Sequence, residues 1–488
     1  MINPIFKSEF DNFFQNKPTS DQILALERFS DFLFSGIDRS LFVLRGYAGT
    51  GKTSLMAAVV KSLEAMNIQC VLLAPTGRAA KVMSRFADHP AFTIHKAIYR
   101  QKSFNLNPDF DLGFNSHKGA LFIVDEASMI SDRPDDGRMQ ESLLQSLMTF
   151  VYGRDQGCRL VFVGDDAQLP PVGEDVSPAL SAQVMRSYAM RVYETTLREV
   201  VRQADSGGIL WNATMLRKAL DGDTLAGLPR IRFQEFADIK AVPGDMLIDT
   251  LAECYDKSGM EETMVVCRSN RLANIYNNGI RSQILWRESE LETGDLVMVA
   301  KNNYYWTDKL RKENENNRTE DALMDFMANG DIAVVRRVRN VRSFYGFNFA
   351  DCELAFPDYD DLEMEATVLL DTLHAEAPAL TQAQNEKLFN NVMEDYMDIP
   401  TQQERLKQLR NDPYYNAVQL KYAYAVTCHK AQGGQWENIF IDQGFVPEDT
   451  SIKEYYRWLY TAMTRATNNL FLVNWKDSQT EDSSSVSA

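Results

Sequence analysis

Residues 46–53 read Gly46-Tyr47-Ala48-Gly49-Thr50-Gly51-Lys52-Thr53 and fit the phosphate-loop pattern G-x-x-x-x-G-K-[ST]. An apolar run at 41–44 predicts a buried strand before the loop, and residues 54–60 predict a helix after it. In this setting backbone N–H groups close on phosphate oxygens at the positive end of the helix dipole. Lys52 is expected to reach the β- and γ-phosphates, and the Thr53 hydroxyl to bind Mg²⁺. A chance glycine-rich turn is the weaker alternative, because strand, loop and helix occur in the required order.

The composition limits the class of protein. A chain of 488 residues with 45% apolar residues predicts two to four folded domains. The net charge of −17, from 51 basic and 68 acidic residues, argues against a protein that coats nucleic acid, although a narrow basic groove stays compatible with it. Six scattered cysteines form no C-x-x-C pair, which disfavours a zinc site. Without an apolar run of about 18 residues or a signal-peptide pattern, a cytoplasmic protein without membrane contact is expected.

Polar side chains follow two further apolar runs. Asp125 and Glu126 end the run 121–124, where an aspartate can hold Mg²⁺ through water and a glutamate can orient the attacking water. Gln168 follows the run 159–163 and is the candidate sensor of the γ-phosphate. Strands that alternate with helices predict a parallel, doubly wound sheet that binds its ligand at the carboxyl ends of the strands.

Several other positions allow two interpretations each. Gln22, in the first turn of a helix predicted from about residue 20, either caps that helix or reads an adenine edge. Thr76 and Arg78 open a helix and either cap it or bind nucleic-acid phosphate. His95 is equally compatible with a surface histidine. Arg202 either lies on the surface or reaches the nucleotide.

Two stretches stand apart from the alternating pattern. Residues 96–118 interleave aromatic residues, among them Tyr99 and Phe104, with Asn, Pro, Asp and Gly, which predicts a small hairpin-like insertion. These rings either form their own small core, the slightly favoured interpretation for most of them, or stack against bases. The basic cluster at 336–342 is interpreted either as a solvated strand edge or as a functional surface.

The ordered motifs resemble those of the superfamily 1 helicases of the RecD/Dda type, which move 5′ to 3′ on single-stranded DNA. The resemblance covers nearly the whole chain. Its segments, which match motifs I, Ia, Ib, II, III, IV, V and VI in that order, are GYAGTGKT (46–53), APTGRAAK (74–81), TIH (93–95), DEAS (125–128), GDDAQLPPVG (164–173), VVRQ (200–203), TCHKAQG (427–433) and YTAMTRA (460–466).

The resemblance implies a role for each matching residue. The catalytic set is Lys52, Asp125, Glu126, Gln168 and the two arginine fingers Arg202 and Arg465. The nucleotide site adds Gln22, Gly46, Ala48, Gly49, Thr50, Gly51 and Thr53, with Thr53 and Asp125 on Mg²⁺. The DNA-binding set is Thr76, Arg78, Thr93, His95, Tyr99, Phe104, Asn270, Thr427 and His429. ATP and Mg²⁺ are the implied cofactors.

The expected fold class is α/β, with two RecA-like parallel-sheet domains in tandem, a hairpin insertion and an accessory domain with an SH3-like part. The expected ranges are 1–200 for the first RecA-like domain with its pin-like insertion at about 96–118, 201–295 plus 420–477 for the second, 296–419 for the accessory domain, and 478–488 for a disordered tail. Residues 1–20 are expected to be loosely held. The acidic and helical parts of 296–419 fit the family pattern poorly.

The expected function is an ATP-dependent DNA helicase with single-stranded and forked duplex DNA as partners. Single-strand-binding or replication proteins are further candidate partners, and the chain is expected to be a monomer. Four alternatives stay open at this point: a translocase that does not unwind DNA, a motor subunit of a larger nuclease, a nucleotide switch, and an RNA motor.

Overall fold

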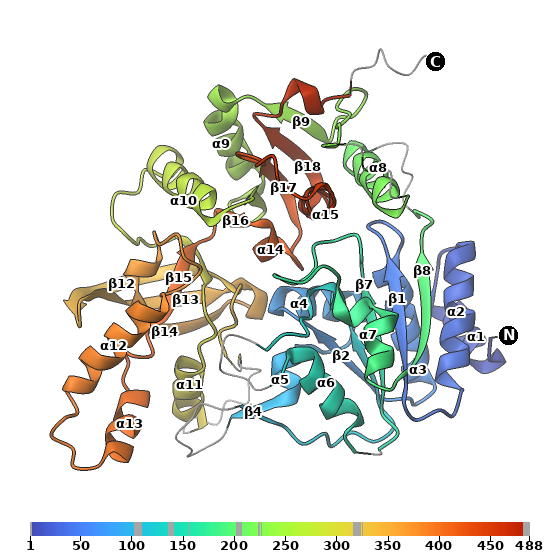
Figure 1. Cartoon of the computed structure of the whole chain (residues 1–488), viewed down its shortest axis with the longest axis horizontal. Coiled ribbons are helices and arrows are strands. Elements are labelled where there is room, and N and C mark those ends of the chain that lie inside the picture. The colour runs from blue at the N-terminus through green and yellow to red at the C-terminus, as the bar shows by residue number, and fades with distance from the viewer. Residues whose placement is uncertain are drawn as a thin grey trace.

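The computed structural model describes residues 2–101, 110–134, 141–154, 156–201, 207–222, 225, 227–315, 324 and 326–481. Figure 1 shows three parts: a first α/β body drawn in blue to teal, a second α/β body in green and red, and a β-barrel in yellow to orange. No helix in these ranges is both long and apolar enough to cross a membrane.

The first body contains a six-stranded sheet in the order β3-β2-β6-β7-β1-β8, whose paired strands all run parallel. Its strands are β1 (Ser40–Gly46), β2 (Cys70–Ala74), β3 (Ala91–Thr93), β6 (Leu121–Val124), β7 (Arg159–Gly164) and β8 (Arg191–Leu197). Its helices are α1 (Pro4–Phe13), α2 (Ser20–Leu33), α3 (Lys52–Ala65), α4 (Gly77–Ala87), α5 (Ile94–Ile98), α6 (Leu143–Tyr152) and α7 (Ala182–Ser187). Alternate residues of β1 enter two separate cores: Phe42 and Leu44 pack with α1, α2 and α3, and Leu41 and Val43 pack with α5 and α6. Both faces of the sheet are therefore covered, as parallel strands require.

The expectation that residues 1–20 are loosely held is wrong. Asn3 caps α1 by accepting hydrogen bonds from the backbone N–H groups of Ile5 and Phe6 (3.0 and 3.3 Å), and Pro4 occupies the first helical position. Phe6 and Phe10 lie on one helix face and are buried, with the ring of Phe6 5.8 Å from that of Phe29. These two anchors hold the helix against the core of the first body.

The second body contains a five-stranded parallel sheet in the order β16-β10-β17-β18-β9. Its strands are β9 (Ile239–Val242), β10 (Thr263–Cys267), β16 (Ala425–Thr427), β17 (Trp436–Asp442) and β18 (Ala466–Val473). Its helices are α8 (Gly208–Asp221), α9 (Leu247–Ser258), α10 (Asn270–Gly279), α14 (Cys428–Ala431) and α15 (Ile452–Met463). Since β10 pairs with β16, the chain leaves this body after α10 and returns to complete the sheet.

The excursion between these strands forms a closed barrel, β11-β12-β13-β14-β15. Its strands are β11 (Leu296–Val299), β12 (Ile332–Phe344), β13 (Phe347–Phe356), β14 (Leu362–Leu369) and β15 (Val418–Tyr422); α11 (Tyr305–Glu315) follows β11, and α12 (Gln382–Glu394) and α13 (Gln402–Arg410) lie between β14 and β15. The last strand passes the expected boundary at 419. In the insertion, β4 (Tyr99–Gln101) and β5 (Phe110–Leu112) pair antiparallel. The expected fold class, with two parallel-sheet domains, a hairpin insertion and a barrel, is confirmed.

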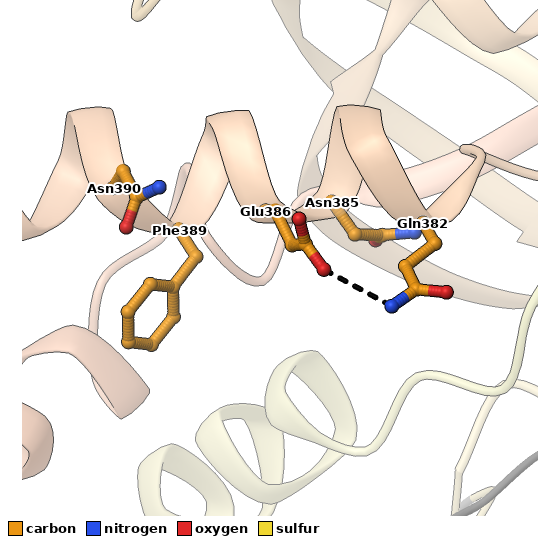
Figure 2. Close-up of a pocket in the computed structure, with 5 residues that line it drawn as sticks. All are labelled: Gln382, Asn385, Glu386, Phe389 and Asn390. Atoms are coloured by element: carbon orange, nitrogen blue, oxygen red, sulfur yellow. Dashed lines mark hydrogen bonds between the residues drawn. The ribbon is translucent and has the colours of Figure 1, made fainter.

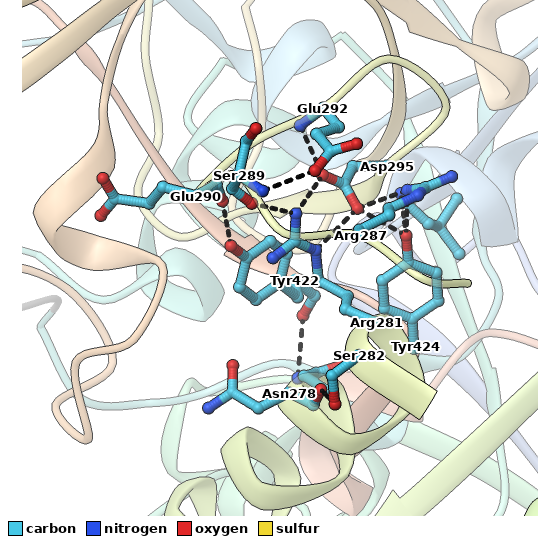
Figure 3. Close-up of polar contacts among 12 residues, drawn as sticks. Asn278, Arg281, Ser282, Arg287, Ser289, Glu290, Glu292, Asp295, Tyr422 and Tyr424 are labelled. Carbon is cyan, nitrogen blue, oxygen red and sulfur yellow. Dashed lines mark hydrogen bonds and ion pairs between the residues drawn. The ribbon is translucent and has the colours of Figure 1, made fainter. Parts of the chain in front are cut away.

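A buried ion-pair network joins the second body to the barrel (Figure 3). Asp295, fully buried, accepts hydrogen bonds from Arg281 Nε and Nη2 (2.9 and 3.0 Å), from the Tyr424 hydroxyl (2.8 Å) and from Arg287. Arg281 follows α10, whereas Asp295 immediately precedes β11. The barrel is therefore fastened to the second body where the chain passes from one to the other.

The predicted disordered tail begins too early. Gln479 is buried, and its amide nitrogen donates to the Tyr455 hydroxyl (3.0 Å) while its backbone carbonyl accepts from Ile231 N (2.7 Å). Residues 478–481 are therefore part of the second body, because one buried glutamine joins them to α15. Residues 482–488 lie outside the described part.

Candidate nucleotide and nucleic-acid site

The phosphate loop connects β1 to α3 and has the positive φ angles that its glycines allow. Gly49 and Gly51 have φ values of +77° and +78°, a left-handed region that glycine enters without steric cost. Lys52 Nζ donates to the carbonyl oxygens of Gly46 and Tyr47, the latter at 3.0 Å. The Thr50 hydroxyl donates to Tyr47 O at 2.8 Å. The lysine therefore lies along the loop, within reach of the space that the backbone amides enclose.

Gln22 caps α2 and also contacts the loop. Its Oε1 accepts from the backbone N–H of Thr19 (3.0 Å), and its own N–H donates to the Thr19 hydroxyl (3.2 Å). The other end of the amide, Nε2, donates to the carbonyl of Thr50 at 3.1 Å. The structure thus shows the capping interpretation, and the added bond to Thr50 fixes α2 beside the phosphate loop. An adenine-reading role stays a prediction.

The carboxylate pair lies where β6 ends. Burial, followed by the neighbouring charge of Glu126, raises the pKa of Asp125 to about 6, and Lys52 opposes that shift. Asp125 Oδ1 accepts from the backbone N–H of Glu126 at 2.9 Å. Glu126 itself has a φ of +50°, a strained conformation for a residue with a side chain, and such strain gathers at functional sites.

These donors suit Mg²⁺. The described residues contain no cluster of three or more His, Cys, Asp or Glu side chains able to hold a metal ion. Mg²⁺ retains several waters and commonly binds through one or two protein oxygens together with substrate phosphates. Asp125 and Thr53, the second residue of α3, supply oxygens of that kind.

The segment after β7 is held by the second body. The backbone N–H of Leu169 donates to the Thr461 hydroxyl of α15 (2.8 Å), and the carbonyl of Leu169 accepts from Gln432 Nε2 (2.8 Å). Gln168, adjacent to it, is 4% exposed, and its Oε1 has no hydrogen-bond partner among the described residues. A buried amide oxygen without a partner costs free energy, so such atoms are commonly found where a ligand binds.

Arg465 follows α15 and is only 3% exposed. Its guanidinium donates to the carbonyls of Thr461 (Nε, 3.1 Å) and Gly434 (Nη1, 3.2 Å) and to the Thr464 hydroxyl (Nη2, 3.2 Å). All three acceptors belong to the second body. The arginine is therefore held rigidly on the helix that contacts the segment after β7.

The phosphate loop also touches the second body directly. The Tyr47 hydroxyl donates to the Asp221 carboxylate of α8 (2.8 Å), and the Arg217 guanidinium lies 4.4 Å from the Tyr47 ring centre. The backbone N–H of Ala48 donates to the hydroxyl of Tyr460 in α15 (2.9 Å). Neither Asp221 nor Tyr460 was singled out in the sequence, although Tyr460 opens the segment YTAMTRA that did stand out. The nucleotide-binding loop thus lies at the junction of the two bodies.

Two expected residues, Arg202 and Phe104, lie outside the described residues. Of the expected DNA-binding residues, Thr76 and Thr93 cap α4 and α5 by accepting from Ala79 N (3.2 Å) and Lys96 N (3.3 Å). The capping interpretation of Thr76 is therefore shown. Both threonines lie at the carboxyl ends of neighbouring strands, β2 and β3.

Arg78 spans the two bodies. Its Nη2 donates to the carbonyl of Gln435 (2.6 Å), and its guanidinium lies 4.2 Å from the Trp436 ring centre. Close by, a Cβ at Gly433 would come 3.0 Å from the Thr76 hydroxyl. The segments 76–78 and 433–436, which the sequence places far apart, therefore lie against each other.

The remaining expected DNA-binding residues lie at or just after the ends of strands, or in the short helices that follow them. Asn270 begins α10 after β10, and Thr427 ends β16, where it makes no capping hydrogen bond to α14. Burial lowers the pKa of His429, which favours its neutral form. His95 packs near Tyr99 and Phe326, at ring distances of 5.6 and 5.9 Å, so the base of the insertion contacts a segment that leads into the barrel.

The basic cluster on β12 is paired with acidic side chains. The distances are 3.8 Å for Arg336–Glu363, 3.8 Å for Arg337–Glu353, 3.6 Å for Arg339–Glu365 and 2.7 Å for Arg342–Asp351. β12 lies inside a closed barrel rather than at a sheet edge, which corrects the strand-edge interpretation. Each of these four arginines therefore has an acidic partner on a neighbouring strand.

A hollow of about 430 Å³ lies along α12, lined by Gln382, Asn385, Glu386, Phe389 and Asn390. Figure 2 shows these side chains along one helix, with Gln382 donating to Glu386 at 3.0 Å. None of the expected site residues lines this hollow. It therefore lies apart from the nucleotide site.

A phosphate loop on one parallel sheet, strand-end carboxylates beside it, and a second parallel sheet whose helices α8 and α15 contact the loop define a P-loop NTPase with two RecA-like bodies. The model of the family described as "AAA domain" matches residues 33–232, and that of the "UvrD-like helicase C-terminal domain" matches residues 422–473.

The chain is 25% identical over 442 residues to the ATP-dependent RecD2 DNA helicase of Deinococcus radiodurans, covering 88% of this chain and 46% of the relative. It is 23% identical to the ATP-dependent DNA helicase dda of Enterobacteria phage T4, covering 52% of this chain and 55% of the relative. A crystal structure of a Pif1 helicase from Bacteroides is similar at 14% identity and a TM-score of 0.46, over 94% of this chain and 93% of that one. The chain thus spans about half the length of these two sequence relatives. In these matches the chain is similar to superfamily 1 helicases of the RecD/Dda type.

Proposed function

We propose that this protein is an ATP-dependent DNA helicase that moves 5′ to 3′ along single-stranded DNA and unwinds duplex DNA. The observation that carries the proposal is the position of the phosphate loop, whose Tyr47 and Ala48 contact α8 and α15 of the second body. Binding of a triphosphate at such a junction biases the two bodies toward closure, and hydrolysis releases them. The similarity to RecD2 and Dda, which are ATP-dependent DNA helicases, supports the assignment.

Each residue has a distinct role in this proposal. Lys52 and the loop amides bind the β- and γ-phosphates, and Thr53 and Asp125 would hold Mg²⁺, which would supply neutralisation of the phosphate charge. Glu126 orients the attacking water and accepts its proton. Gln168 bonds the γ-phosphate through its amide. Arg465, with Arg202, stabilises the charge that develops on the transferred phosphoryl group.

The DNA path is proposed to follow the carboxyl ends of the strands in both bodies. Thr76 and Thr93 lie at such ends in the first sheet, and Asn270 and Thr427 lie at such ends in the second. Helix-start N–H groups and hydroxyls at these positions bind phosphate without reading sequence. Two bodies that grip the strand in turn would move it one step per ATP. We further propose three domains: 1–200, 201–295 with 423–481, and 296–422, where β15 extends the accessory domain beyond 419 and Gln479 extends the second RecA-like domain beyond 477.

The test measures ATP hydrolysis with and without single-stranded DNA, and unwinding of partial duplexes with 5′ or 3′ overhangs. The proposal predicts DNA-stimulated hydrolysis, loss of hydrolysis in Lys52→Ala with the fold retained, and unwinding from 5′ overhangs only. Lys61→Ala, on the same α3 but outside the motif, is the matched control and should keep activity.

Each alternative predicts a different result. Strand movement without unwinding indicates a translocase, and stimulation by RNA alone indicates an RNA motor. ATP binding without DNA-stimulated hydrolysis indicates a nucleotide switch. Full hydrolysis by Lys52→Ala contradicts the proposed site altogether.

A further inference from the structure

The hydroxyl of Tyr460 connects three segments that the sequence keeps apart. It accepts a hydrogen bond from the backbone N–H of Ala48 in the phosphate loop (2.9 Å) and donates one to Asp165 Oδ2 (2.6 Å). Ala48 follows β1 and Asp165 follows β7, both in the first body, whereas Tyr460 belongs to α15 in the second. One oxygen of the second body therefore bridges two strand ends of the first.

The two side chains of this bridge are buried. Tyr460 is 1% exposed and Asp165 is 1% exposed, so water does not replace the missing partner if either bond is lost. Asp165 Oδ1 is already occupied by the backbone N–H of Ala167 (3.0 Å). Burial raises the pKa of the Tyr460 hydroxyl well above its usual value, so the hydroxyl keeps the proton that it donates.

The bridge also lies between the groups that handle the phosphates. Asp165 precedes Gln168, the candidate γ-phosphate sensor, by three residues. Burial raises the pKa of Asp165 to about 6, and Lys52 lies near enough to oppose that shift. Thr461, the next residue of α15, holds the backbone of Leu169 (2.8 Å). Arg465 is bonded to the carbonyl of Thr461 (3.1 Å), so the bridge and the candidate finger share one helix end.

We propose that Tyr460 is a positioning residue that locks the two bodies around the nucleotide, by bonding the phosphate loop and Asp165 at once. When the bodies separate, water satisfies Ala48 N–H and Asp165, so the open arrangement does not need the hydroxyl. When they close without it, the half-buried amide of Ala48 and the buried carboxylate of Asp165 each lose a partner. This inference rests on the proposed ATP-driven closure. It adds that the Tyr460 hydroxyl couples closure to the position of Ala48 N–H in the phosphate loop.

Tyr460→Phe removes the hydroxyl and keeps the ring. We expect the maximal DNA-stimulated ATP turnover to fall roughly tenfold or more, because Ala48 N–H and Asp165 lose a partner in the closed arrangement. ATP affinity measured without DNA should change less, by about threefold or under, because Lys52 and the loop amides that bind the phosphates stay in place. A loss of fold would instead reduce both quantities together.

Tyr455→Phe is the matched control. Tyr455 lies on the same helix, is also buried, and its hydroxyl also makes two hydrogen bonds, to Gln443 (2.6 Å) and from Gln479 (3.0 Å). Both of those partners belong to the second body. We expect this variant to lose thermal stability, because its bonds lie within one body, while keeping turnover within about twofold.

A double-mutant cycle with Asp165→Asn tests the route of the effect. If the hydroxyl acts through Asp165, the double variant is no slower than the slower single variant. Multiplicative losses, or equal turnover in Tyr460→Phe and Tyr455→Phe, would overturn the inference. Full hydrolysis in Lys52→Ala would instead refute the proposed function, so the two failures are distinguishable.

Discussion

Replacement of Asp295 by alanine tests how firmly the barrel is fixed to the second body. In the wild-type chain this fully buried carboxylate accepts from Arg281, from Arg287, from the Tyr424 hydroxyl and from the backbone of Glu292 (Figure 3). Burial would raise the pKa of Asp295, but the hydrogen bonds from Arg281, the Glu292 backbone and Arg287, together with the charge of Arg281, outweigh burial and lower the pKa. The variant leaves two guanidinium groups with side-chain exposures of 7% and 12% without their shared counter-charge.

Removing one partner of a buried ion pair costs about 3–5 kcal/mol. We expect the lower end, about 3 kcal/mol, because Arg281 keeps its bond to the carbonyl of Ser289 (2.7 Å). For a unit of about 200 residues this corresponds to a Tm lower by roughly 6–12 °C. Since the lowered pKa makes the carboxylate stabilising above its unfolded pKa, the deficit should be full at pH 7 and shrink as pH falls below about 4.

The assay is thermal unfolding followed by tryptophan fluorescence, with each transition read separately because a chain of several domains is not two-state. Arg336→Ala, which removes an exposed pair with Glu363 at 3.8 Å, is the control and should cost less than about 1 kcal/mol. A Tm for Asp295→Ala within about 1 °C of wild type would refute the reasoning, because no buried charge would then have lost its partner.

Three further predictions concern a contact of α4, the Mg²⁺ site and DNA binding. In Gly77→Ala the new Cβ would lie 2.4 Å from the Tyr359 hydroxyl, so we expect the turn at 357–359 to be displaced from α4. Thermal unfolding should show a loss of about 1–3 kcal/mol that Tyr359→Ala restores, and unchanged unfolding of Gly77→Ala would contradict the contact. Because the pKa of Asp125 is raised to about 6, mainly by burial, protons should compete with Mg²⁺ below that pH, and the Mg²⁺ concentration for half-maximal ATPase should rise about tenfold from pH 7 to pH 5; a flat Mg²⁺ requirement would exclude Asp125 as a ligand. Single-stranded DNA affinity, measured by fluorescence anisotropy, should fall as salt rises despite the net charge of −17, and affinity independent of salt would rule out a phosphate-gripping channel.

The sequence was sufficient for the parts of the fold that local pattern controls. Apolar runs that end in polar residues identified β1, β6 and β7, since parallel strands buried on both faces read as continuous apolar segments. The phosphate loop could be predicted at 46–53 because its backbone needs the positive φ of Gly49 and Gly51, which glycine adopts without strain. Residues such as Lys52 and Asp125 could be named in advance because their positions follow from those strands.

Other features depend on contacts between distant segments, which periodicity does not reveal. The burial of Phe6 and Phe10 depends on the contact of α1 with Phe29, which belongs to a different helix. Tyr460 could be located in a helix, but its bonds to Ala48 and Asp165 arise only when the two bodies meet. The acidic partners of the β12 arginines lie on neighbouring strands of a barrel whose closure the sequence does not indicate.

The measurement that tests the central claim most directly compares ATP binding and single-turnover hydrolysis in Arg465→Ala and Arg465→Lys, with DNA present. If the nucleotide lies between the two bodies, both variants should bind ATP within about threefold of wild type, and the alanine variant should hydrolyse it about 10³–10⁵-fold more slowly, as arginine fingers do in other phosphoryl-transfer enzymes. Hydrolysis by Arg465→Ala at the wild-type rate would contradict the claim that the second body completes the catalytic site.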